Sequence, residues 1–412
     1  KQVFTITKKV YMRKVLLSLV LMMFAVATVQ AQIRTFKGKD GYKIKVKFTD
    51  VTDSNIYLVH YYGKPLPTIY RTDSATLNKK GEAVFQSDTF TLGGIYMVLM
   101  SDKASYFEIL LNNGDEFSVT ATKADLPSGI SFKNSDENTR FVKYVSYLTD
   151  YGKRSMELNK EFESAETAKD TARVREEYKK LSKELKDYRE DYIKKYPNTL
   201  LSNIFNALKV PEVPEGKHYL PDGTEDSSFA YEYYKGHYWD DWNFRDDRLI
   251  HTPIYDGRLE EYFEKLVLPI PDTFQMEADK ILAKAKGTQD MFKYTLWWLT
   301  RFAESSKVMG MDAAFVYLVE NYYMRGEAFW LSSDDLQKYI DRAQKIAPNV
   351  LGKIAPELKM PDWDGNMHSL HELDAKYTLL IFWSPECGHC LTEMPQVDSL
   401  YEAVLKKKGV KI

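Results

Sequence analysis

The sequence predicts a multidomain protein in which an all-β, sandwich-like domain is followed by an α-helical domain and then by the first half of an α/β fold. Three observations lead to this fold class. Residues 32–133 contain short strands separated by turn residues, and residues 134–350 contain amphipathic helices. Residues 351–412 show one strand, one helix and the start of a second strand. A chain of 412 residues is also too long for a single core, so two or three domains are expected.

Residues 12–31 are predicted to be a secretory signal peptide. Arg13 and Lys14 form its positive end, and residues 15–29 form its apolar stretch. A membrane anchor is the alternative, but the stretch is shorter than the roughly 20 residues that a spanning helix needs. Cleavage is expected after Ala31, which places the mature protein in the periplasm or cell envelope. Residues 1–11 are then expected to lie upstream of the true start.

The all-β domain is predicted from alternating side chains. The segment "YKIKVKF" (Tyr42–Phe48) alternates strictly, as a strand with one buried face does. Turn signals such as "NKKG" and "NNGD" separate it from further runs rich in β-branched and aromatic residues. These runs are residues 55–62, Glu82–Ser87, 95–100, 105–111 and 116–122. Strands at this spacing predict an antiparallel sandwich, and none of them carries catalytic spacing.

The period of the apolar residues changes near Asn134. Long helices are expected up to Lys195, because Pro197 follows and ends them. Further helices are expected up to about residue 350, and Ser332 or Ser333 is a suitable N-cap for the last of them.

The segment "HYWDDWNFRDD" (residues 237–247) in the helical domain could form a metal or sugar site, because it carries four aspartates. The favoured interpretation is a helix–loop–helix whose Tyr and Trp fill the core while the acids face water. No Cys or His spacing supports a closed metal site there.

The charge pattern limits the partners. Lysines and arginines are interleaved with aspartates and glutamates, and the formal net charge is −2. No basic tract of the kind that binds nucleic acid is present, so no nucleic-acid partner is expected.

The chemistry is concentrated in "FWSPECGHCLTEMP" (residues 382–395), which holds the only two cysteines of the chain, Cys387 and Cys390. Residues 378–383 are expected to form a buried strand, and a helix is expected to begin at the cysteines. The first sulfur then lies at a helix N-terminus, where free N–H groups and the helix dipole favour the thiolate. Cys387 is therefore the predicted nucleophile and Cys390, one turn further on, the predicted resolving thiol.

The two intervening residues are expected to tune this pair. His389 would stabilise the Cys387 thiolate by its charge or by a hydrogen bond, and so raise the reduction potential. Gly388 would let a substrate backbone approach closely. A zinc site and a purely structural disulfide are the alternatives. Zinc would need four ligands, with His368 and His371 in an unusual arrangement, and so short a loop stabilises little when it is closed. No metal and no cofactor beyond a redox-active Cys387–Cys390 disulfide are expected.

Residues from about Gly352 onward resemble the exported thioredoxin-like reductases of the TlpA/ResA type. The resemblance rests on Ala355-Pro356, "DWDGN", "LLIFWSPECGHC", Glu393 and Pro395. The two preceding domains resemble the all-β and helical extensions of exported members of this group, a weaker likeness without chemical motifs.

This resemblance implies a thioredoxin-like fold and roles for individual residues. Trp383 would pack beneath the active-site turn, and Glu393 would help to move protons near the thiols. Pro395 would kink the first active-site helix. The Gly-His spacer is more like protein disulfide isomerase, which leaves the direction of electron flow open. The resemblance also implies further strands and a cis-proline loop, so the C-terminal domain is expected to be incomplete at Ile412.

The predicted function is that of an exported thiol–disulfide oxidoreductase. Its partners would be thiols and disulfides of exported proteins, apocytochromes among them, and a membrane thiol donor of electrons. A peroxiredoxin-like thiol peroxidase is the second possibility, with Ser384-Pro385 as a partial match to what that chemistry requires. A non-catalytic envelope binding or scaffold protein is the third.

Overall fold

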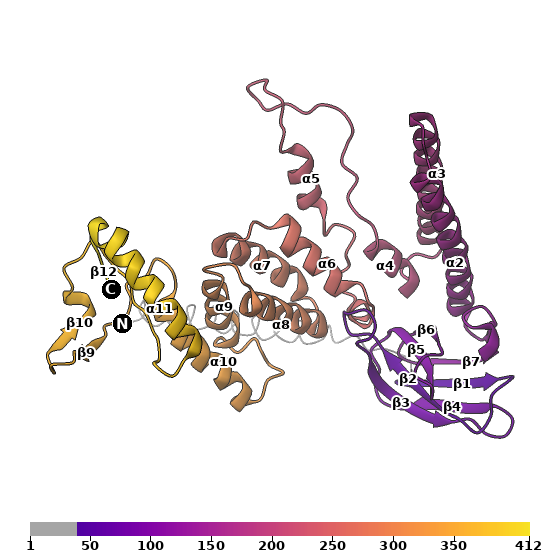
Figure 1. The fold of residues 1–412 in the computed structure, drawn as a ribbon. Coiled ribbons are helices and arrows are strands. Elements are labelled where there is room, and N and C mark those ends of the chain that lie inside the picture. The colour runs from indigo at the N-terminus through magenta and orange to yellow at the C-terminus, as the bar shows by residue number, and fades with distance from the viewer. Residues whose placement is uncertain (1–38) are drawn as a thin grey trace, which may run out of the picture. The chain divides into compact units, whose positions relative to one another are not determined.

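The structure is a computed structural model that describes residues 39–412, so the predicted signal peptide and residues 1–11 lie outside the described residues. The elements follow one another from β1 to β12 (Figure 1). The chain forms two compact units. The first runs to Leu268 and also includes Lys280–Leu296, and the second comprises Pro269–Asp279 and Trp297–Ile412. Within residues 39–412, no helix is long and apolar enough to cross a membrane.

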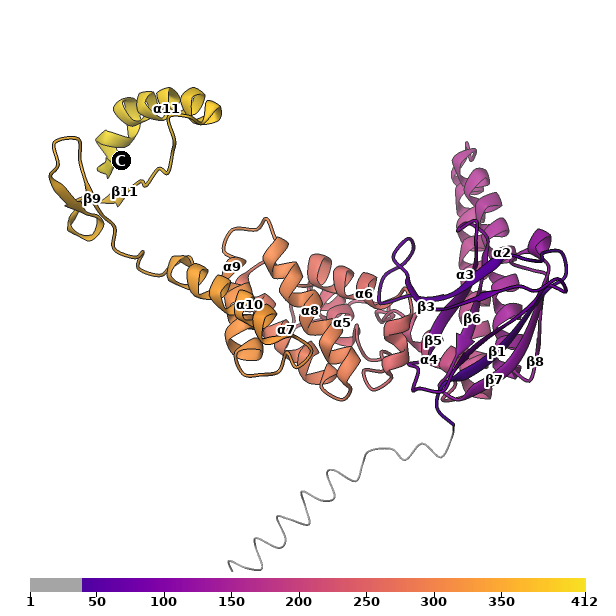
Figure 2. The same cartoon turned by 90° about the horizontal axis from the view of Figure 1, so that it is seen from below.

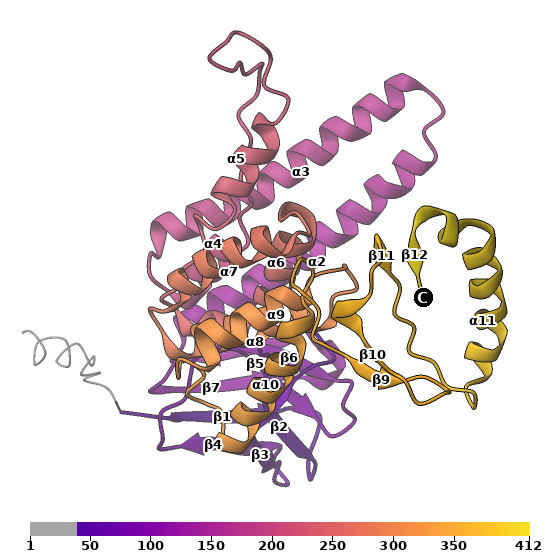
Figure 3. The same ribbon diagram turned by 90° about the vertical axis from the view of Figure 1, so that its left-hand side faces the viewer.

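Two four-stranded sheets form the all-β region of the first unit. One sheet has the order β4-β1-β7-β8 and the other the order β3-β2-β5-β6. Figures 2 and 3 show the strands of both sheets at one end of this unit. The strands are β1 (Tyr42–Phe48), β2 (Asn55–His60), β3 (Tyr70–Thr76), β4 (Glu82–Ser87), β5 (Gly94–Met100), β6 (Tyr106–Leu111), β7 (Asp115–Ala121) and β8 (Ile130–Lys133).

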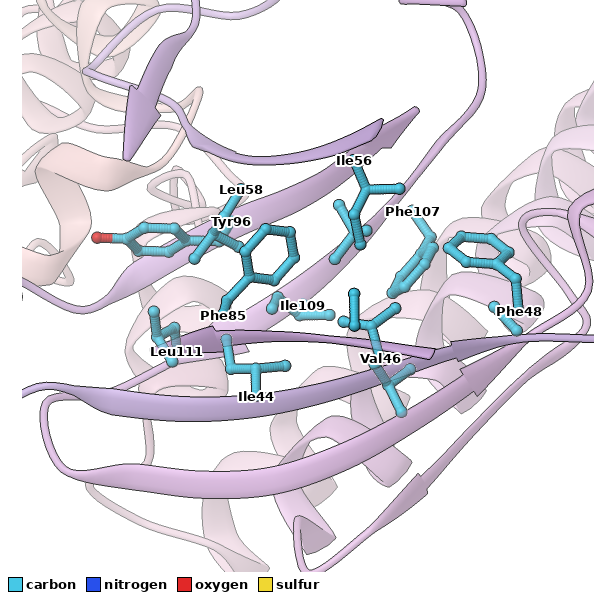
Figure 4. Close-up of a cluster of buried hydrophobic side chains, with 14 of the residues drawn as sticks. Ile44, Val46, Phe48, Ile56, Leu58, Phe85, Tyr96, Phe107, Ile109 and Leu111 are labelled. Atoms are coloured by element: carbon cyan, nitrogen blue, oxygen red, sulfur yellow. The ribbon is translucent and has the colours of Figure 1, made fainter. Parts of the chain in front are cut away.

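The core of this region lies between the two sheets. Side chains from β1, such as Ile44 and Val46, meet side chains from the opposite sheet, such as Leu58 and Ile109 (Figure 4). All four are almost completely buried. Burying one such side chain contributes about 1.5–3 kcal/mol to the free energy of folding. Because alternate side chains of Tyr42–Phe48 point to the same face, their apolar members are buried together and hold the strand against the core. The predicted sandwich-like all-β region is confirmed.

Two details of the predicted sandwich are wrong. The pair β1–β7 is parallel, whereas an antiparallel sandwich was expected. The chain leaves the first sheet after β4, adds β5 and β6 to the second sheet, and returns to pair β7 with β1 in the same direction. Strands β3 and β8 were also not predicted. Strand β3 is largely exposed and polar, so it lacks an apolar alternation.

Two long helices follow the sandwich and form an antiparallel hairpin. Helix α2 (Asp136–Glu163) begins at Ser135, whose Oγ accepts a hydrogen bond from the Asn138 N–H. Helix α3 (Ala168–Lys195) begins at Thr167, which caps it in the same way. The two helices lie side by side in Figures 1 and 3, and α2 packs against β6 and β8. Helix α4 (Leu200–Ala207) follows and packs against α3.

The rest of the first unit is helical and rich in aromatic side chains. Its elements are α5 (Phe229–His237), η2 (Asp247–His251), α6 (Tyr255–Glu261) and η3 (Tyr262–Leu266). Tyr238, Trp239 and Trp242 are buried, and Asp240 and Asp241 are exposed, as the favoured interpretation of residues 237–247 requires.

Two aspartates of this segment do not face water as expected. Asp247 is half-buried and accepts from the Met291 N–H at 3.0 Å, and the carboxylate of Asp246 is buried. The Asp246 carboxylate accepts hydrogen bonds from Arg248 Nε at 2.8 Å and Nη2 at 2.7 Å, and from Asn203 Nδ2 at 2.5 Å. It therefore holds two parts of the helical region together and is not a free ligand.

The second unit contains the last helices of the helical region. Helices α7 (Pro271–Ala285) and α8 (Gln289–Ser305) contribute residues to both units. The second unit continues with α9 (Asp312–Leu318), η4 (Val319–Tyr323), α10 (Ser333–Ile346) and η5 (Ala347–Asn349). Ser332 caps α10, because its Oγ accepts from the Asp335 N–H at 3.1 Å, which confirms one of the two predicted caps.

The last part of the second unit begins with a short hairpin. Strands β9 (Lys359–Pro361) and β10 (Met367–Ser369) are antiparallel, and Gly365 in their turn has a φ of +85°. The two strands thus form a hairpin that turns at Asp364-Gly365. It is followed by η6 (Leu370–Glu372), β11 (Tyr377–Thr378), α11 (Gly388–Leu400), η7 (Tyr401–Leu405), η8 (Lys406–Lys408) and β12 (Val410–Lys411).

The strand predicted for residues 378–383 is wrong in length and burial. Only Tyr377–Thr378 are in strand conformation, paired in parallel with Val410–Lys411 (Figure 3). Phe382 and Trp383 are 83% and 52% exposed. An apolar run becomes a buried strand only when neighbouring strands pair with it along its length. In the described part of the chain, this run has such a partner only at its first residue, Thr378.

Candidate functional site

The two cysteines lie where the chain turns into helix α11. Cys387 is the N-cap of the helix and has an extended backbone, with φ −87° and ψ 110°. Its N–H donates to the Ser384 carbonyl at 3.1 Å, and its own carbonyl accepts from the Leu391 N–H at 3.1 Å. Cys390 therefore lies in the first helical turn, as predicted. Both thiols are reduced and partly exposed.

The first sulfur accepts a hydrogen bond from the second cysteine. The backbone N–H of Cys390 donates to the Cys387 Sγ, with 3.4 Å between the nitrogen and the sulfur. This N–H is one of those that an α-helix leaves unpaired in its first turn. The side chain and the backbone N–H of Cys390, followed by the backbone N–H of His389, lower the pKa of the Cys387 thiol. This arrangement favours the thiolate form of Cys387, which is the form that attacks disulfides.

The contribution of His389 differs from the expected one. Its imidazole is exposed and makes no recorded contact with Cys387 within the described residues. Its backbone N–H, by contrast, contributes to lowering the pKa of the Cys387 thiol. The geometry therefore assigns the effect of residue 389 to its position in the first helical turn. The sequence analysis expected backbone donors at this helix N-terminus, but it assigned the effect of residue 389 to the imidazole ring.

Gly388 leaves the space beside the thiols open. A Cβ built on this residue would meet no other atom within 4 Å. The absence of a side chain at this position adds to this open space, and a role in substrate approach stays a prediction.

The structure does not bring Glu393, Pro395 and Trp383 against the sulfurs. Glu393 is exposed on α11, and no hydrogen bond or ion pair joins it to another described residue. Pro395 lies inside α11, where it cannot donate the usual helical hydrogen bond to Leu391. Trp383 is half exposed, so it is not packed beneath the turn in this structure.

Ser384 belongs to the turn that carries the nucleophile. Its carbonyl accepts from the Cys387 N–H, and its Oγ accepts from the Glu386 N–H at 3.3 Å. The hydroxyl is thus held three residues before Cys387.

The two histidines of the preceding segment are engaged within their own hairpin region. His368 Nε2 lies 2.9 Å from the Asp362 carboxylate, and His371 Nε2 lies 2.7 Å from the Ala355 carbonyl oxygen. Among residues 39–412, no group of three or more metal-ligating side chains is found.

Comparison with known families divides the chain into three matched segments. Residues 42–141 match one domain of unknown function (DUF4369), and residues 163–349 match another (DUF5106). Residues 351–412, which carry both cysteines, match the AhpC/TSA family. Among solved structures, a thioredoxin-like protein from Bacteroides caccae aligns with a TM-score of 0.37 at 20% identity, over 49% of this chain and 71% of that chain.

Curated relatives match a small part of the chain. A thiol-disulfide oxidoreductase ResA from Geobacillus kaustophilus is 37% identical over 62 residues, which are 15% of this chain and 35% of the relative. One from Bacillus cereus is 34% identical over 76 residues, which are 18% of this chain and 42% of the relative. The chain thus spans less than half the length of these proteins. Residues 351–412 accordingly match the AhpC/TSA family and have weak similarity to ResA.

Proposed function

We propose that the protein is an exported thiol–disulfide oxidoreductase of the TlpA/ResA type, which exchanges disulfides with proteins of the cell envelope. The observation that carries the proposal is the position of Cys387. Its sulfur is the N-cap of α11, accepts the Cys390 N–H, and is partly exposed as a free thiol. The similarity of this segment to thiol-disulfide oxidoreductases supports the same chemistry.

The mechanism has two exchange steps. The Cys387 thiolate attacks one sulfur of a substrate disulfide, a Cys387–substrate disulfide forms, and the other substrate sulfur leaves as a thiolate. Cys390 then loses its proton to solvent and attacks the Cys387 sulfur. This step releases the second substrate thiolate and leaves a Cys387–Cys390 disulfide. The substrate has gained two electrons and the cysteine pair has lost two.

Each turnover then requires an electron donor that reduces the Cys387–Cys390 disulfide. A membrane-embedded thiol protein is the proposed donor, and exported proteins, including apocytochromes, are the proposed substrates. The direction of net electron flow is set by the reduction potential of the pair relative to these partners. No resident cofactor is required, because the electrons travel through sulfur alone.

Trapping of mixed disulfides tests this proposal. Cys390→Ser should accumulate disulfide-linked partners in envelope extracts, because the resolving thiol is missing while Cys387 still attacks. Cys387→Ser should trap few partners. Acid-quenched extracts are compared on non-reducing and reducing gels. Equal trapping by the two single variants would contradict the assigned roles. Retention of the same partners by Cys387→Ala/Cys390→Ala would instead favour the scaffold function.

Peroxide reduction by Cys387 is the second candidate function. It is favoured by the Ser384 hydroxyl, which the turn holds three residues before the nucleophile. A peroxide would oxidise the Cys387 thiolate to a sulfenic acid and release water or an alcohol, and Cys390 would then condense with it to a disulfide and a second water. Rapid turnover of hydrogen peroxide with a thiol donor, lost in Ser384→Ala and in Cys387→Ser, would support this candidate over disulfide exchange.

A further inference from the structure

The first unit contains a cavity of about 470 Å³ beside strand β6, far along the sequence from the cysteines. Such a volume is within the range of roughly 300–1,000 Å³ found for small-molecule sites. Three elements surround it: β6 with the residues before it, helix α2, and the connection from β7 into β8. The lining residues are Ala104, Ser105, Tyr106, Phe107, Glu108, Lys123, Leu126, Pro127, Ile130, Val142 and Val145.

The alternation of β6 explains why a carboxyl group lies in this cavity. Phe107 and Ile109 point into the core between the two sheets. Successive side chains of a strand point to opposite faces, so Tyr106 and Glu108 lie on the face that α2 covers. Val142 and Val145 are three positions apart on α2, so they lie on the same side of the helix. Glu108 is thus the single acidic group in a lining that is otherwise mostly apolar.

Within the described residues, this carboxyl group has one hydrogen-bond partner and no cation. The Tyr61 hydroxyl donates to Glu108 Oε1 at 2.6 Å. Lys123 also lines the cavity, but its Nζ lies 2.8 Å from Asp102 Oδ2 and is neutralised there. Desolvation raises the pKa of Glu108. A carboxylate held out of water without a cation is costly, and a cation brought by a ligand would remove that cost.

We propose that this cavity binds an aliphatic primary amine, with the ammonium group against Glu108 and the hydrocarbon chain against Leu126, Ile130 and the two valines of α2. Charge complementarity selects the ammonium end, since the lining offers one acid that has a hydroxyl partner but no cation, and a lysine whose charge Asp102 already balances. The apolar lining selects the hydrocarbon body. The amine can be a free alkylamine or the side chain of a lysine, which share this chemistry.

Titration of the full chain with n-hexylamine tests the proposal, with calorimetry and the melting temperature as readouts. Saturable binding is expected, hexanol should bind at least tenfold more weakly, and hexanoate should not bind. Nα-acetyl-lysine methylamide distinguishes the two sources. Affinity equal to that of hexylamine identifies a lysine side chain, and affinity more than tenfold lower identifies a free amine.

Two variants and one control keep the test specific. Glu108→Gln should weaken hexylamine binding at least tenfold, while Glu116→Gln, an exposed acid on β7, should leave it unchanged. Val142→Phe reduces the cavity without changing the charge and should also weaken binding at least tenfold. Unchanged affinity in a folded Glu108→Gln variant, equal loss in Glu116→Gln, or absence of saturable binding to the wild-type chain would overturn the proposal.

Discussion

The backbone N–H of Cys390 donates to the Sγ of Cys387 across 3.4 Å, so the proposed resolving residue also stabilises the thiolate of the proposed nucleophile. The Cys390 side chain makes the largest contribution to the lowered pKa of the Cys387 thiol. The two roles of Cys390 can be separated by substitution, because serine keeps a hydrogen-bond donor and alanine does not.

Cys390→Ala should therefore shift the pH profile of Cys387 alkylation upward. Losing the side-chain donor raises the pKa of the Cys387 thiol toward the ordinary value of about 8.5, and iodoacetamide should react more slowly at pH 7. Mass spectrometry of the Cys387 peptide across pH 5–10 gives the midpoint. Cys390→Ser should show a smaller shift. Identical midpoints in wild type and Cys390→Ala would show that the side chain does not stabilise the thiolate.

His389→Pro should lower the reduction potential of the pair, whereas His389→Ala should leave it nearly unchanged. Proline removes the backbone N–H that favours the Cys387 thiolate, and alanine keeps it. A shift on the order of tens of millivolts is expected for proline, measured by equilibration with glutathione. An equal drop in His389→Ala would mean that the imidazole, and not the backbone, stabilises the thiolate.

Acid should destabilise the first unit through His251. The imidazole of His251 stacks on His60 with ring centroids 3.9 Å apart. Burial and then the neighbouring His60 lower the pKa of His251 to about 3. The unfolded chain binds this proton near pH 6.5, so stability is complete above that pH and falls as the pH drops toward 3. The melting temperature should follow the same course.

Replacing His251 tests that source of acid sensitivity. His251→Phe should flatten the decline of the melting temperature between pH 7 and pH 4.5. His237→Gln, at an exposed histidine, should keep the wild-type slope. A slope that persists unchanged in His251→Phe would assign the acid sensitivity to other groups.

Asn138 should be essential for the attachment of α2 to the sandwich. Its Oδ1 accepts from the Leu110 N–H at 2.7 Å, and its Nδ2 donates to the Leu110 carbonyl at 2.8 Å. Asn138 is buried, so alanine would leave the backbone groups of an edge strand unpaired. A loss of about 1–3 kcal/mol in the free energy of unfolding is expected in denaturant titrations. Glu157→Ala, at an exposed position of the same helix, should cost less than about 0.5 kcal/mol.

Local patterns predicted much of the fold. The alternation in Tyr42–Phe48 predicted β1 to the residue, and Ser332 was correctly identified as a cap of α10. In both cases the signal lies within one element. The polar strand β3 was missed because its pairing with β2 is set by tertiary contacts that no apolar alternation reveals. The strand predicted for residues 378–383 was wrong for the converse reason, since the run is apolar but is paired with another strand only at Thr378.

The candidate site likewise has features that the sequence predicted and features that it did not. The place of Cys387 and Cys390 at a helix start was predictable, because a strand followed by a helix leaves one position for the N-cap. The relative contributions of the His389 ring and backbone to the pKa of the Cys387 thiol depend on the direction of the side chain. The spacing of the two cysteines in the sequence does not give that direction. The cavity beside Glu108 was not predictable either, since "SYFEILL" shows an outward-facing acid and gives no sign that α2 covers it.

The central claim is that Cys387 attacks and Cys390 resolves, and a time course with oxidised glutathione tests it most directly. Intact and peptide mass spectrometry after acid quenching follow the products. The wild-type chain should pass through a glutathione adduct on Cys387 and end as the Cys387–Cys390 disulfide, and Cys390→Ser should stop at that adduct. An adduct that forms first on Cys390, or one that persists on Cys387 in the wild-type chain, would contradict the account.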